Sequence, residues 1–328
     1  MIITKTPFRV SFCGGGSDLP SFYEQFGGCV LSASINKYMY ISIHPYFDSK
    51  QTVLKYSQTE MVDDLSGIQH KIFNCVLNEE QLGGVEITCT ADIPAGTGLG
   101  SSSSFTVGLL HTIAGYRGKY VAKPKLAARA CEIEINKLGN PIGKQDQYAA
   151  ALGGLNFIRF NQDGGVSHEP IVMKPETKRE LQNSLCMFYL GSMRSANEIL
   201  SEQKKNMSNA QKTDNLRKMC ALTENMKVSL EDNDLSEFGS ILDASWKLKR
   251  ELASGISNPE IDVLYEKAIR AGATGGKLLG AGGGGFLLFF CELEKQERLR
   301  LALALRQMRF AFDNDGTSVV YIGDKYWD

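Results

Sequence analysis

Long apolar runs are missing from this sequence of 328 residues. No uncharged apolar stretch reaches the roughly 18 residues that a membrane-spanning helix needs. The first segment, MIITKTPFRVSF, also lacks the apolar core and cleavage site of a signal peptide. These two absences predict a cytoplasmic protein that has no membrane among its partners.

An excess of either charge is missing too. Lys and Arg total 36 against 37 for Asp and Glu, so the formal net charge is −1. Proteins that bind nucleic acids or acidic membranes in general carry a basic excess. The charge balance therefore excludes nucleic acid as a general partner, although it still allows a local basic pocket.

Metal-binding and disulfide patterns are also absent. None of the eight cysteines forms a C-x-x-C pair, and the four histidines are scattered with no other ligand type nearby. Most cysteines lie inside apolar runs such as CVLSASI and LCMFYL. This distribution predicts buried, reduced thiols rather than a zinc site or a disulfide framework.

The chain does contain a mixed pattern of strands and helices, and it is long enough for two domains. The polar stretch 161–183 indicates a boundary that divides it into domains 1–175 and 176–328. Strand and helix runs do not alternate regularly, so we expect an α+β fold rather than a doubly wound one. The expected elements of the first half are strands at 2–12, 34–46, 85–92 and 154–160 and helices at about 102–116, 123–139 and 144–154. Those of the second half are strands at 184–190 and 317–323, amphipathic helices across 195–271, two strands around a glycine turn within 275–292 and a helix at 294–308.

The stretch PAGTGLGSSSS at 94–104 is the most informative local feature, because it is uncharged and lies between a predicted strand and a predicted helix. Glycines let backbone N–H groups approach a ligand, since no Cβ stands in the way. The first turn of the following helix adds free N–H groups and a positive dipole end. Together these features favour a phosphate site. A flexible, serine-capped loop is the alternative, but such a linker has no reason to lie between two buried apolar elements.

Two other phosphate motifs do not fit. A Walker A loop is absent, because the GGK at 275–277 is followed by Leu. A G-x-G-x-x-G pattern occurs at 280–285, but it precedes the strand-like FLLFF, whereas a dinucleotide fingerprint precedes a helix. The sequence therefore disfavours an NAD-binding oxidoreductase.

The stretch at 94–104 resembles the central motif of the GHMP small-molecule kinases, P-x-x-x-G-L-G-S-S-[SA]. TPFRVSFCGGGSDLP at 6–20 is similar to the first motif of that family, and KLLGAGGGGFLLFF at 277–290 is similar to the third. Three motifs in the right order make the resemblance specific. Within the family, FRVSFCGGGSDLPSFYEQFGGCVLSASINKY and GNPIGKQDQYAAALGGLNFI most resemble the heptose kinases.

The resemblance implies a two-domain GHMP kinase fold, with an N-terminal domain like domain 2 of ribosomal protein S5 and a ferredoxin-like C-terminal domain. It implies an ATP- and Mg²⁺-dependent phosphotransferase with an alcohol acceptor. The implied acceptor is the C1 hydroxyl of D-glycero-D-manno-heptose 7-phosphate, on the route to nucleotide-heptose and surface polysaccharide. A kinase of another sugar, such as fucose or a hexose, and a non-catalytic sensor with this fold remain alternatives. A homodimer is left open.

The resemblance also assigns roles to single residues. Asp146 would orient and accept the proton of the acceptor hydroxyl, and Arg9 would stabilise the transferring phosphoryl group or keep Asp146 ionised. The structural alternatives are a helix cap for Asp146 and an exposed strand end for Arg9. Ser102 and Glu134 would hold Mg²⁺, with Glu132 as a competitor for the second position. The residues expected to bind ATP are Pro94, Gly96, Thr97, Gly98, Leu99, Gly100, Ser101, Ser102 and Ser103.

The acceptor site is expected at the first glycine cluster. Glycines allow a close approach of the backbone to sugar hydroxyls, and a carboxylate can accept two sugar O–H bonds. A plain turn with an Asx cap is the structural alternative for this cluster. Ordinary surface cations are the alternative for the two candidate phosphate-binding residues named next. A tight hairpin is the alternative for the glycines near the C-terminus. Lys144 and Arg194 are the candidates for binding the acceptor's own phosphate. The remaining residues expected to contact the substrate are Gly14, Gly15, Gly16, Ser17, Asp18, Gly282 and Gly283.

Overall fold

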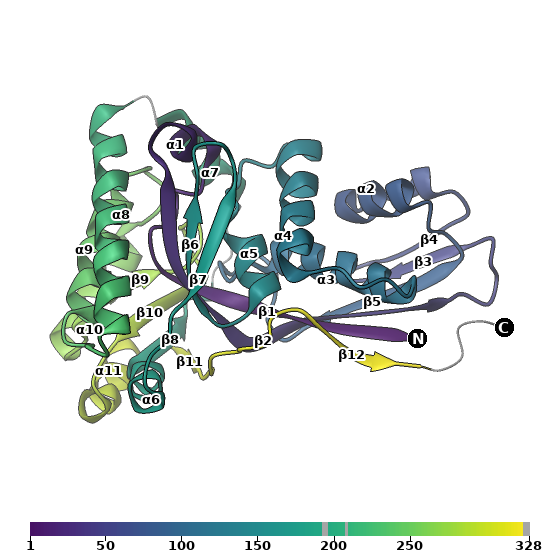
Figure 1. Cartoon of the computed structure of the whole chain (residues 1–328). Coiled ribbons are helices and arrows are strands. Elements are labelled where there is room, and N and C mark those ends of the chain that lie inside the picture. Colours follow the sequence, from purple (N-terminus) through teal and green to yellow (C-terminus); the bar gives the residue numbers. More distant parts are fainter. Residues whose placement is uncertain (192–195, 207–208, 324–328) are drawn as a thin grey trace.

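The computed structural model of the chain describes residues 1–191, 196–206 and 209–323. It contains a large sheet that runs along the long axis of the molecule and a smaller sheet covered by helices at one end (Figure 1). The expected α+β fold is confirmed. Within the described residues, no helix has both the length and the apolar character that crossing a membrane requires.

Across the described ranges, the large sheet has eight strands, and all but one of its pairings are antiparallel. Its main path runs β12-β1-β2-β5-β3-β4, and β6 and β7 branch off from β2. The exception is the parallel pair of β3 and β5. The strands are β1 (Ile2–Cys13), β2 (Gly28–Pro45), β3 (Thr52–Lys55), β4 (Thr59–Val62), β5 (Val85–Ala91), β6 (Leu155–Phe160), β7 (Val166–Pro170) and β12 (Ser318–Ile322).

Strand β2 is longer than the expected strand 34–46, because the apolar residues before Ser34 continue the pairing. Residues 28–33 pair with β6, whereas residues 39–45 pair with β5. The first half of β2 is buried throughout and the second half is more exposed. One strand thus connects the part of the sheet beneath the cavity described below with the part that extends away from it.

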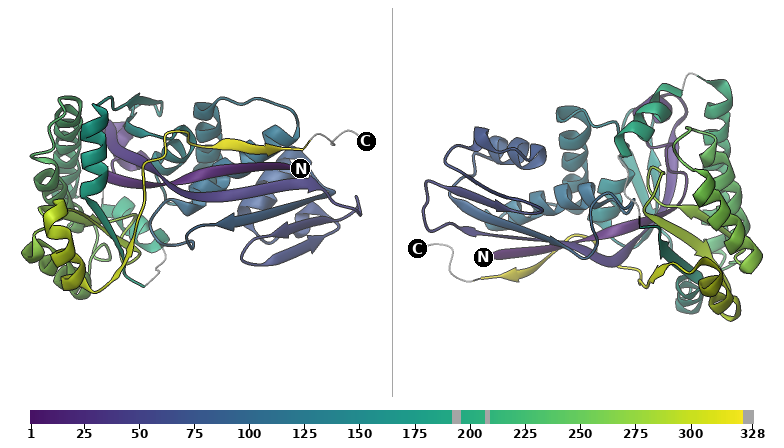
Figure 2. Two further views of the ribbon diagram at one scale, coloured as in Figure 1. Left: turned by 90° about the horizontal axis from the view of Figure 1, so that it is seen from below. Right: turned by 180° about the vertical axis from the view of Figure 1, so that it is seen from behind.

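Helices cover one face of this sheet (Figures 1 and 2). The central one, α3, is apolar on nearly every side and mostly buried. It packs closely on β1: a Cβ on Gly108 would lie 2.8 Å from Oγ1 of Thr6. The helical elements of this part are α1 (Pro20–Phe26), η1 (Leu65–Gly67), α2 (Lys71–Glu80), α3 (Ser101–Tyr116), α4 (Lys123–Cys131), the π-helical turn η2 (Glu132–Lys137) and α5 (Gln145–Leu152).

The small sheet has the order β11-β8-β10-β9 with antiparallel pairs throughout. In chain order this is fourth, first, third, second, the ferredoxin-like arrangement expected for the C-terminal half. Its strands are β8 (Leu185–Tyr189), β9 (Gly275–Leu278), β10 (Phe286–Phe290) and β11 (Arg306–Met308). The helices of this part are α6 (Pro175–Ser184), α7 (Ala196–Lys205), α8 (Ala210–Glu231), α9 (Phe238–Arg250), α10 (Pro259–Ala271), the short η4 (Leu293–Lys295) and α11 (Gln296–Leu303).

The last strand, β12, returns to the large sheet and pairs antiparallel with β1. Ile322 lies opposite Ile2, and Val319 lies opposite Thr4. The chain order therefore does not separate the two sheets cleanly. The domain boundary near residue 175 stays a prediction, and it did not anticipate this return.

Apolar side chains from both sheets meet in one core. Phe12 of β1 packs edge-on against Phe238 of α9, with ring centroids 5.4 Å apart. Leu288 of β10 belongs to the same cluster. Burial of aromatic rings is a strong source of cohesion, so the two sheets are held together beneath the cavity.

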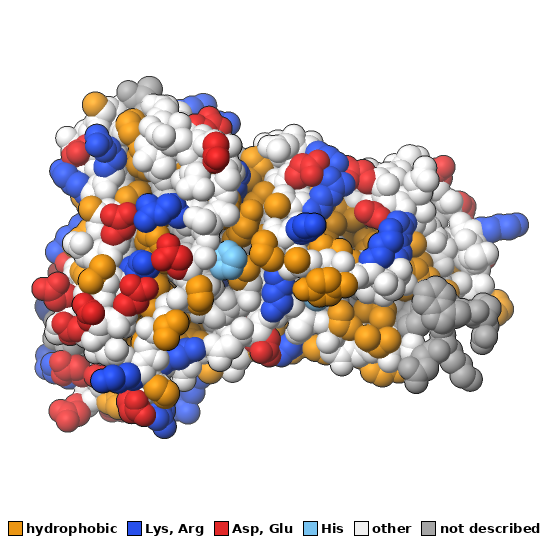
Figure 3. Space-filling view, in the orientation of Figure 1, with side chains coloured by type: hydrophobic (Ala, Val, Ile, Leu, Met, Phe, Trp, Pro, Cys, Tyr) orange, Lys and Arg blue, Asp and Glu red, His pale blue; other side chains and the backbone are white. Residues whose placement is uncertain are grey.

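The surface charges are mixed and the thiols are free, as the charge balance and the cysteine spacing predict. On the face in Figure 3, Lys and Arg alternate with Asp and Glu, and the described residues form no continuous basic patch there. All eight cysteines lie in the described residues and are free; five are buried and three are half-buried.

Candidate active site

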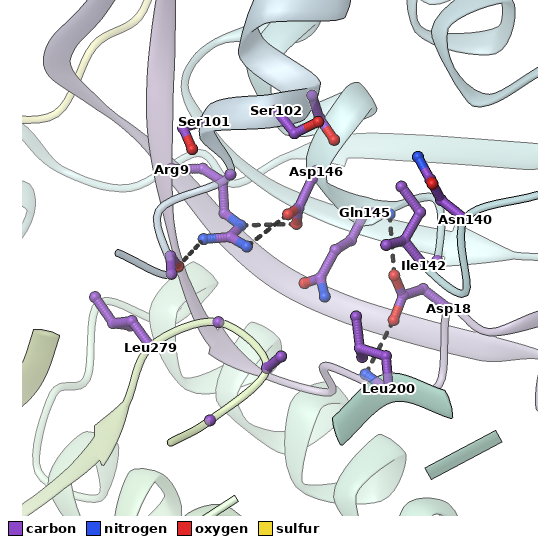
Figure 4. A pocket seen from close by; sticks show the side chains of 18 of the residues that line it. Arg9, Asp18, Ser101, Ser102, Asn140, Ile142, Gln145, Asp146, Leu200 and Leu279 are labelled. Atoms are coloured by element: carbon purple, nitrogen blue, oxygen red, sulfur yellow. Dashed lines mark hydrogen bonds and ion pairs between the residues drawn. The ribbon is translucent and has the colours of Figure 1, made fainter. Parts of the chain in front are cut away.

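A cavity of about 390 Å³ opens between the large sheet and the helical part of the second half. It is lined by the loop after β5 and the start of α3, by the turn after β1, and by η2 and the start of α5. The second half contributes α7, the end of α9 and the loop between β9 and β10. Figure 4 shows side chains from these separate segments pointing into one space. All three glycine-containing motifs therefore converge here.

The loop after β5 is shaped by three glycines. Gly96, Gly98 and Gly100 have φ angles of 77°, 82° and 78°, a left-handed region that disfavours other residues. Gly100 is the N-cap of α3, and no side chain caps the helix there. The first-turn N–H groups of α3 are thus left for a ligand, as an anion site requires.

The loop also contacts the second glycine loop directly. A Cβ on Gly98 would lie 2.5 Å from the carbonyl oxygen of Leu279, and one on Gly280 would lie 2.5 Å from Cα of Gly98. Such distances leave no room for a side chain on either residue. The two loops therefore form one surface of backbone atoms at the bottom of the cavity.

Not all of the residues expected to bind ATP face the cavity. Gly96, Gly98, Gly100 and Ser101–Ser103 line it. Thr97 is buried, and its hydroxyl donates to the carbonyl of Pro94 at 3.0 Å. Leu99 is buried in the core, and its carbonyl accepts from the backbone N–H of Arg9 at 3.1 Å. Pro94, Thr97 and Leu99 hold the loop in shape from outside the cavity.

Arg9 and Asp146 form a bidentate ion pair at the mouth of this loop (Figure 4). Nε of Arg9 donates to Oδ1 of Asp146 at 2.8 Å, and Nη2 donates to Oδ2 at 2.7 Å. Nη1 donates to the carbonyl oxygen of Gly98 at 2.6 Å. Arg9 is only 3% exposed, so these are strong charge-assisted bonds that fix both side chains. The pair ties the start of α5 to the glycine loop.

Glu134 points into the cavity from η2, and its side chain is completely buried. Its oxygens accept from the Ser102 hydroxyl at 2.7 Å and from the amide of Gln147 at 2.8 Å. Burial raises the pKa of this carboxyl, although both hydrogen bonds act in the opposite direction. The chain was expected to be one helix here, but its π-helical turn alters the side-chain directions, as often occurs at functional sites.

Glu132, the competitor for the same role, points to the surface. Its carboxylate pairs with Arg129 at 2.7 Å and with Lys137 at 3.5 Å, and it is half-exposed. The geometry thus favours Glu134 as the carboxylate that faces a ligand.

Ser102 and Glu134 fit a divalent cation. Among the described residues, no three His, Cys, Asp or Glu side chains cluster as a complete metal cage. Mg²⁺ usually needs only one or two protein oxygens, because phosphate oxygens and waters fill its other positions. The buried Glu134 has no cationic partner within the described residues, and a bound cation would compensate its charge.

The turn after β1 is braced mainly by its own side chains. The Ser17 hydroxyl lies 2.8 and 2.9 Å from the carbonyl oxygens of Gly14 and Cys29 and accepts from the Cys29 N–H at 3.0 Å. A Cβ on Gly14 would lie 2.0 Å from the Cys29 carbonyl oxygen. Ser17 is buried and, like Gly14 and Gly15, does not line the cavity, whereas Gly16 does.

Asp18 lines the cavity and also joins the turn to α5. Its oxygens accept from the backbone N–H groups of Gly16 at 2.9 Å and Gln145 at 3.2 Å. Burial and the neighbouring Asp146 charge raise the pKa of this carboxyl. Each oxygen keeps a second lone pair, so a sugar hydroxyl could still donate to it.

Of the two residues expected to bind the acceptor's phosphate, Lys144 is not brought into the cavity. Nζ of Lys144 donates to the Gly164 carbonyl at 2.6 Å and lies 4.7 Å from the centre of the Tyr23 ring. Lys144 does not line the cavity, so the geometry does not support its predicted role. Arg194 lies outside the described residues. Gly282 lines the cavity, but Gly283 instead donates its N–H to Ile256 at 3.1 Å.

Other polar residues line the cavity and were not anticipated. Oε1 of Gln145 and Nε2 of Gln203 are buried and lack a hydrogen-bond partner within the described part of the chain. Lys249, near the end of α9, is 6% exposed and also lines the cavity. It lies three and seven residues after Trp246 and Leu242 in an amphipathic helix, a spacing that places it on the buried face. That spacing was the signal that could have identified it.

Comparison with known proteins identifies the family of the chain. Residues 68–154 match the family model for the N-terminal domain of GHMP kinases, and residues 226–308 match the model for their C-terminal domain. The two matches include the glycine loop, Glu134 and Asp146 in the first half and Lys249 and the second glycine loop in the other.

Similar proteins act on phosphorylated and free sugars. The chain is 32% identical to a D-glycero-alpha-D-manno-heptose 7-phosphate kinase of Campylobacter jejuni, over 96% of this chain and 97% of that protein. It is 26% identical to a galactokinase of Pyrococcus furiosus, over 91% of each protein. Its structure resembles that of a D-glycero-D-manno-heptose 1-phosphate kinase from Bacteriodes thetaiotaomicron with a TM-score of 0.81, 27% identity and coverage of 99% of this chain and 100% of that chain.

Proposed function

The chain belongs to the GHMP kinase family, and from that membership we propose that it transfers the γ-phosphoryl group of ATP to the C1 hydroxyl of D-glycero-D-manno-heptose 7-phosphate. This chain is an ATP-dependent phosphotransferase of that family with an alcohol acceptor, a sugar kinase. The product would be the 1,7-bisphosphate, an intermediate toward nucleotide-activated heptose for surface polysaccharide.

The observation that carries this proposal is the uncapped start of α3 with Arg9 and Asp146 beside it. The triphosphate would lie along the backbone of 96–103, where free N–H groups and the helix dipole favour negative charge. Phosphoryl transfer is catalysed mainly by positioning and electrostatic stabilisation. A phosphate cradle next to a fixed cation–carboxylate pair is the arrangement that this chemistry needs.

Asp146 acts as the proton acceptor in this proposal. The acceptor oxygen forms a bond to the γ-phosphorus while the bond from that phosphorus to the bridging oxygen breaks, and the electron pair leaves with ADP. The proton of the acceptor hydroxyl passes to the Asp146 carboxylate. Arg9 orients this carboxylate, because two of its N–H groups hold both oxygens.

The sugar would lie against Gly16 and Asp18. The unpaired polar atoms of Gln145 and Gln203 border the same turn, and buried polar atoms without a partner are uncommon unless a ligand or water satisfies them. A sugar ring offers hydroxyls that both donate and accept. These side chains therefore support a carbohydrate as the acceptor, without indicating its number of carbons.

Ser102 and Glu134 would hold the Mg²⁺ that kinases of this family typically use. When bound, the cation would neutralise charge on the phosphate oxygens. In its absence, the donors to the buried Glu134 carboxylate within the described residues are the neutral Ser102 hydroxyl and Gln147 amide.

We expect Glu134→Gln to stabilise the metal-free protein while weakening its Mg²⁺-dependent turnover. An amide removes the buried charge. Oε1 of Gln147, which has no hydrogen-bond partner within the described residues of the natural protein, can accept from the new amide after a flip. The free energy of unfolding should rise by about 1 kcal/mol, and turnover at limiting Mg²⁺ should fall at least about tenfold. Urea denaturation in EDTA and a Mg²⁺ titration of ADP release measure the two effects.

Glu132→Gln is the matched control, because it makes the same change on a half-exposed carboxylate of the same turn. It should leave the Mg²⁺ dependence unchanged and give no gain in stability. Equal Mg²⁺ dependence in the two variants would remove Glu134 from the proposed metal site.

ADP release with a panel of acceptors tests the proposed function. Heptose 7-phosphate should react faster than free heptose, heptose 1-phosphate, fucose and galactose. Phosphorus NMR of the product should show a new phosphate coupled to the anomeric proton. If a free sugar reacts far better, the substrate proposal is wrong, although the kinase assignment stands.

A hexose kinase is the second candidate, because the galactokinase of P. furiosus matches 91% of this chain. That reading predicts fast turnover with galactose or fucose and none of the preference for a phosphorylated acceptor. The same panel separates the two candidates directly.

A further inference from the structure

Lys249 is a buried cation at the cavity that the mechanism above does not use. It lies in the last turn of α9 and is 6% exposed. Its Nζ donates to the Gly280 carbonyl at 2.7 Å, and no ion pair joins it to a carboxylate within the described residues. An ammonium has three donors, so at least two remain for other partners.

Charged groups from several elements surround this ammonium. Burial lowers its pKa to about 8, and the Arg9 charge on β1 acts in the same direction. Asp18 and Asp146 act in the opposite direction, as does the Cys13 thiol on β1. Lys277 of β9 is also near: its own pKa lies well below the ordinary value because of burial and the Lys249 charge.

Lys249 lies between the proposed acceptor site and the glycine loop after β5. A Cβ on Gly15, in the turn after β1, would lie 3.7 Å from Nζ of Lys249. On the other side it holds Gly280, which contacts Gly98 of the phosphate loop. The ammonium thus lies where the acceptor and the end of the triphosphate would meet.

The electrostatic balance around Lys249 is incomplete without a ligand. Asp146 is already bound by Arg9, and both oxygens of Asp18 accept backbone N–H groups. A buried charge without an opposite partner is unfavourable and is typical of a functional site. Lys277 differs, because it donates to the Phe12 carbonyl and does not line the cavity.

We propose that Lys249 is a catalytic residue that contacts the phosphoryl group during its transfer, as a second cation in addition to Arg9. This inference rests on the proposed function, since it needs a phosphoryl group at the end of the glycine loop. Arg9 comes from the large sheet and Lys249 from the helical half, so the group in transfer would be held by both parts of the chain. Charge that develops on its oxygens would be stabilised by donors already in place.

Lys249→Met and Lys249→Arg, with Lys247→Met as the control, test this role. Lys247 lies on the same helix but is exposed and pairs with Asp243. Lys249→Met should lower kcat about 20-fold, less than loss of a single oxyanion-hole donor because Arg9 shares the charge. Lys247→Met should leave kcat unchanged.

The pH profile supplies a readout that a merely structural lysine would not move. Only the protonated amine carries charge, so kcat/KM of the natural protein should fall as the pH rises through about 8. An arginine keeps its charge over this range, and the fall should be absent from Lys249→Arg. If the fall persists in Lys249→Arg, the proposal is overturned, even where Lys249→Met fails to fold.

A binding measurement separates this proposal from the identity of the acceptor. ADP with aluminium fluoride mimics the phosphoryl group in transfer, whereas AMP-PNP mimics ground-state ATP. With Mg²⁺ present, Lys249→Met should weaken binding of ADP with aluminium fluoride about 20-fold and binding of AMP-PNP less than threefold. Equal losses would make Lys249 a support of the glycine loop and overturn the proposal. Absence of ADP release from the natural protein with every sugar would instead refute the proposed function.

Discussion

Asp146→Asn is expected to lower kcat by about 10²- to 10⁴-fold, the usual range for a positioned proton acceptor. Asparagine has nearly the same size, but its amide cannot take the proton of the acceptor hydroxyl. Its NH₂ group would also face one of the two Arg9 N–H groups that now donate to Asp146. Coupled ADP release at saturating ATP and acceptor measures the loss.

Binding of ATP should respond quite differently to this substitution. Removing a negative charge beside the triphosphate cannot weaken its attraction to the loop, so AMP-PNP should bind as tightly as before or slightly more tightly. Arg9 keeps its third contact, to the Gly98 carbonyl, which maintains the loop. A parallel loss of AMP-PNP affinity would mean that Asp146 serves the architecture of the site rather than the proton transfer.

Asp232→Asn provides the matched control. Asp232 is exposed at the end of α8, so the same change of charge is made away from the cavity. Its kcat should equal that of the natural protein. Near-normal turnover in Asp146→Asn would refute the assignment of the base and leave the family assignment intact.

The glycine loop could be predicted from the sequence because its signals are local. Left-handed backbone at Gly96, Gly98 and Gly100 is a property of glycine itself, and the apolar run after Ser104 predicts a buried helix. The fold class follows from the same kind of local pattern. The position of β12 cannot be predicted from local pattern. Its partner β1 lies at the other end of the chain, and pairing over that separation depends on the whole sheet.

Elementary helix geometry bears on the choice between Glu132 and Glu134 and on the predicted role of Lys144. Residues two apart on a helix lie about 200° apart around its axis. Glu132 and Glu134 have this spacing within the π-helical turn η2, and there too they point in different directions: Glu134 lines the cavity, whereas Glu132 pairs with Arg129. Lys144 and Asp146 have the same spacing at the start of α5, so a predicted catalytic Asp146 already argued against Lys144 in the same site.

Lys249 was missed for a different reason. Its residue type is typical of the surface, and its neighbours in sequence include two other cations. Its role depends on contacts with Gly280 and Gly15, which come from distant parts of the chain. Such a cluster becomes visible only once the two halves are packed together.

Gly98→Ala is expected to weaken ATP binding by about 30- to 100-fold. The residue has a φ of 82°, and non-glycine residues in such conformations carry strain of about 1–3 kcal/mol. The new Cβ would also lie 2.5 Å from the Leu279 carbonyl oxygen, which is backbone and cannot turn aside. The free protein can relax by moving the loop, but ATP needs the original shape, so the penalty appears in binding. Calorimetry with AMP-PNP and Mg²⁺ measures it.

Gly118→Ala is the control that separates the backbone strain of a left-handed alanine from the steric clash of its Cβ. Gly118 follows the other end of α3 with a φ of 64°, and a Cβ there meets nothing within 4 Å. This variant should lose about 1 kcal/mol of stability and bind AMP-PNP normally. Equal affinity in Gly98→Ala and Gly118→Ala would contradict a backbone cradle at this loop.

Gly280→Ala probes the same contact from the opposite side, since its Cβ would lie 2.5 Å from Cα of Gly98. We expect a similar loss of affinity from this variant alone. Because both substitutions separate the same two loops, the double variant should lose less binding free energy than the sum of the single losses. Additive losses would mean that each loop contributes independently. A shortfall would show that the triphosphate is held by the two loops acting as one surface.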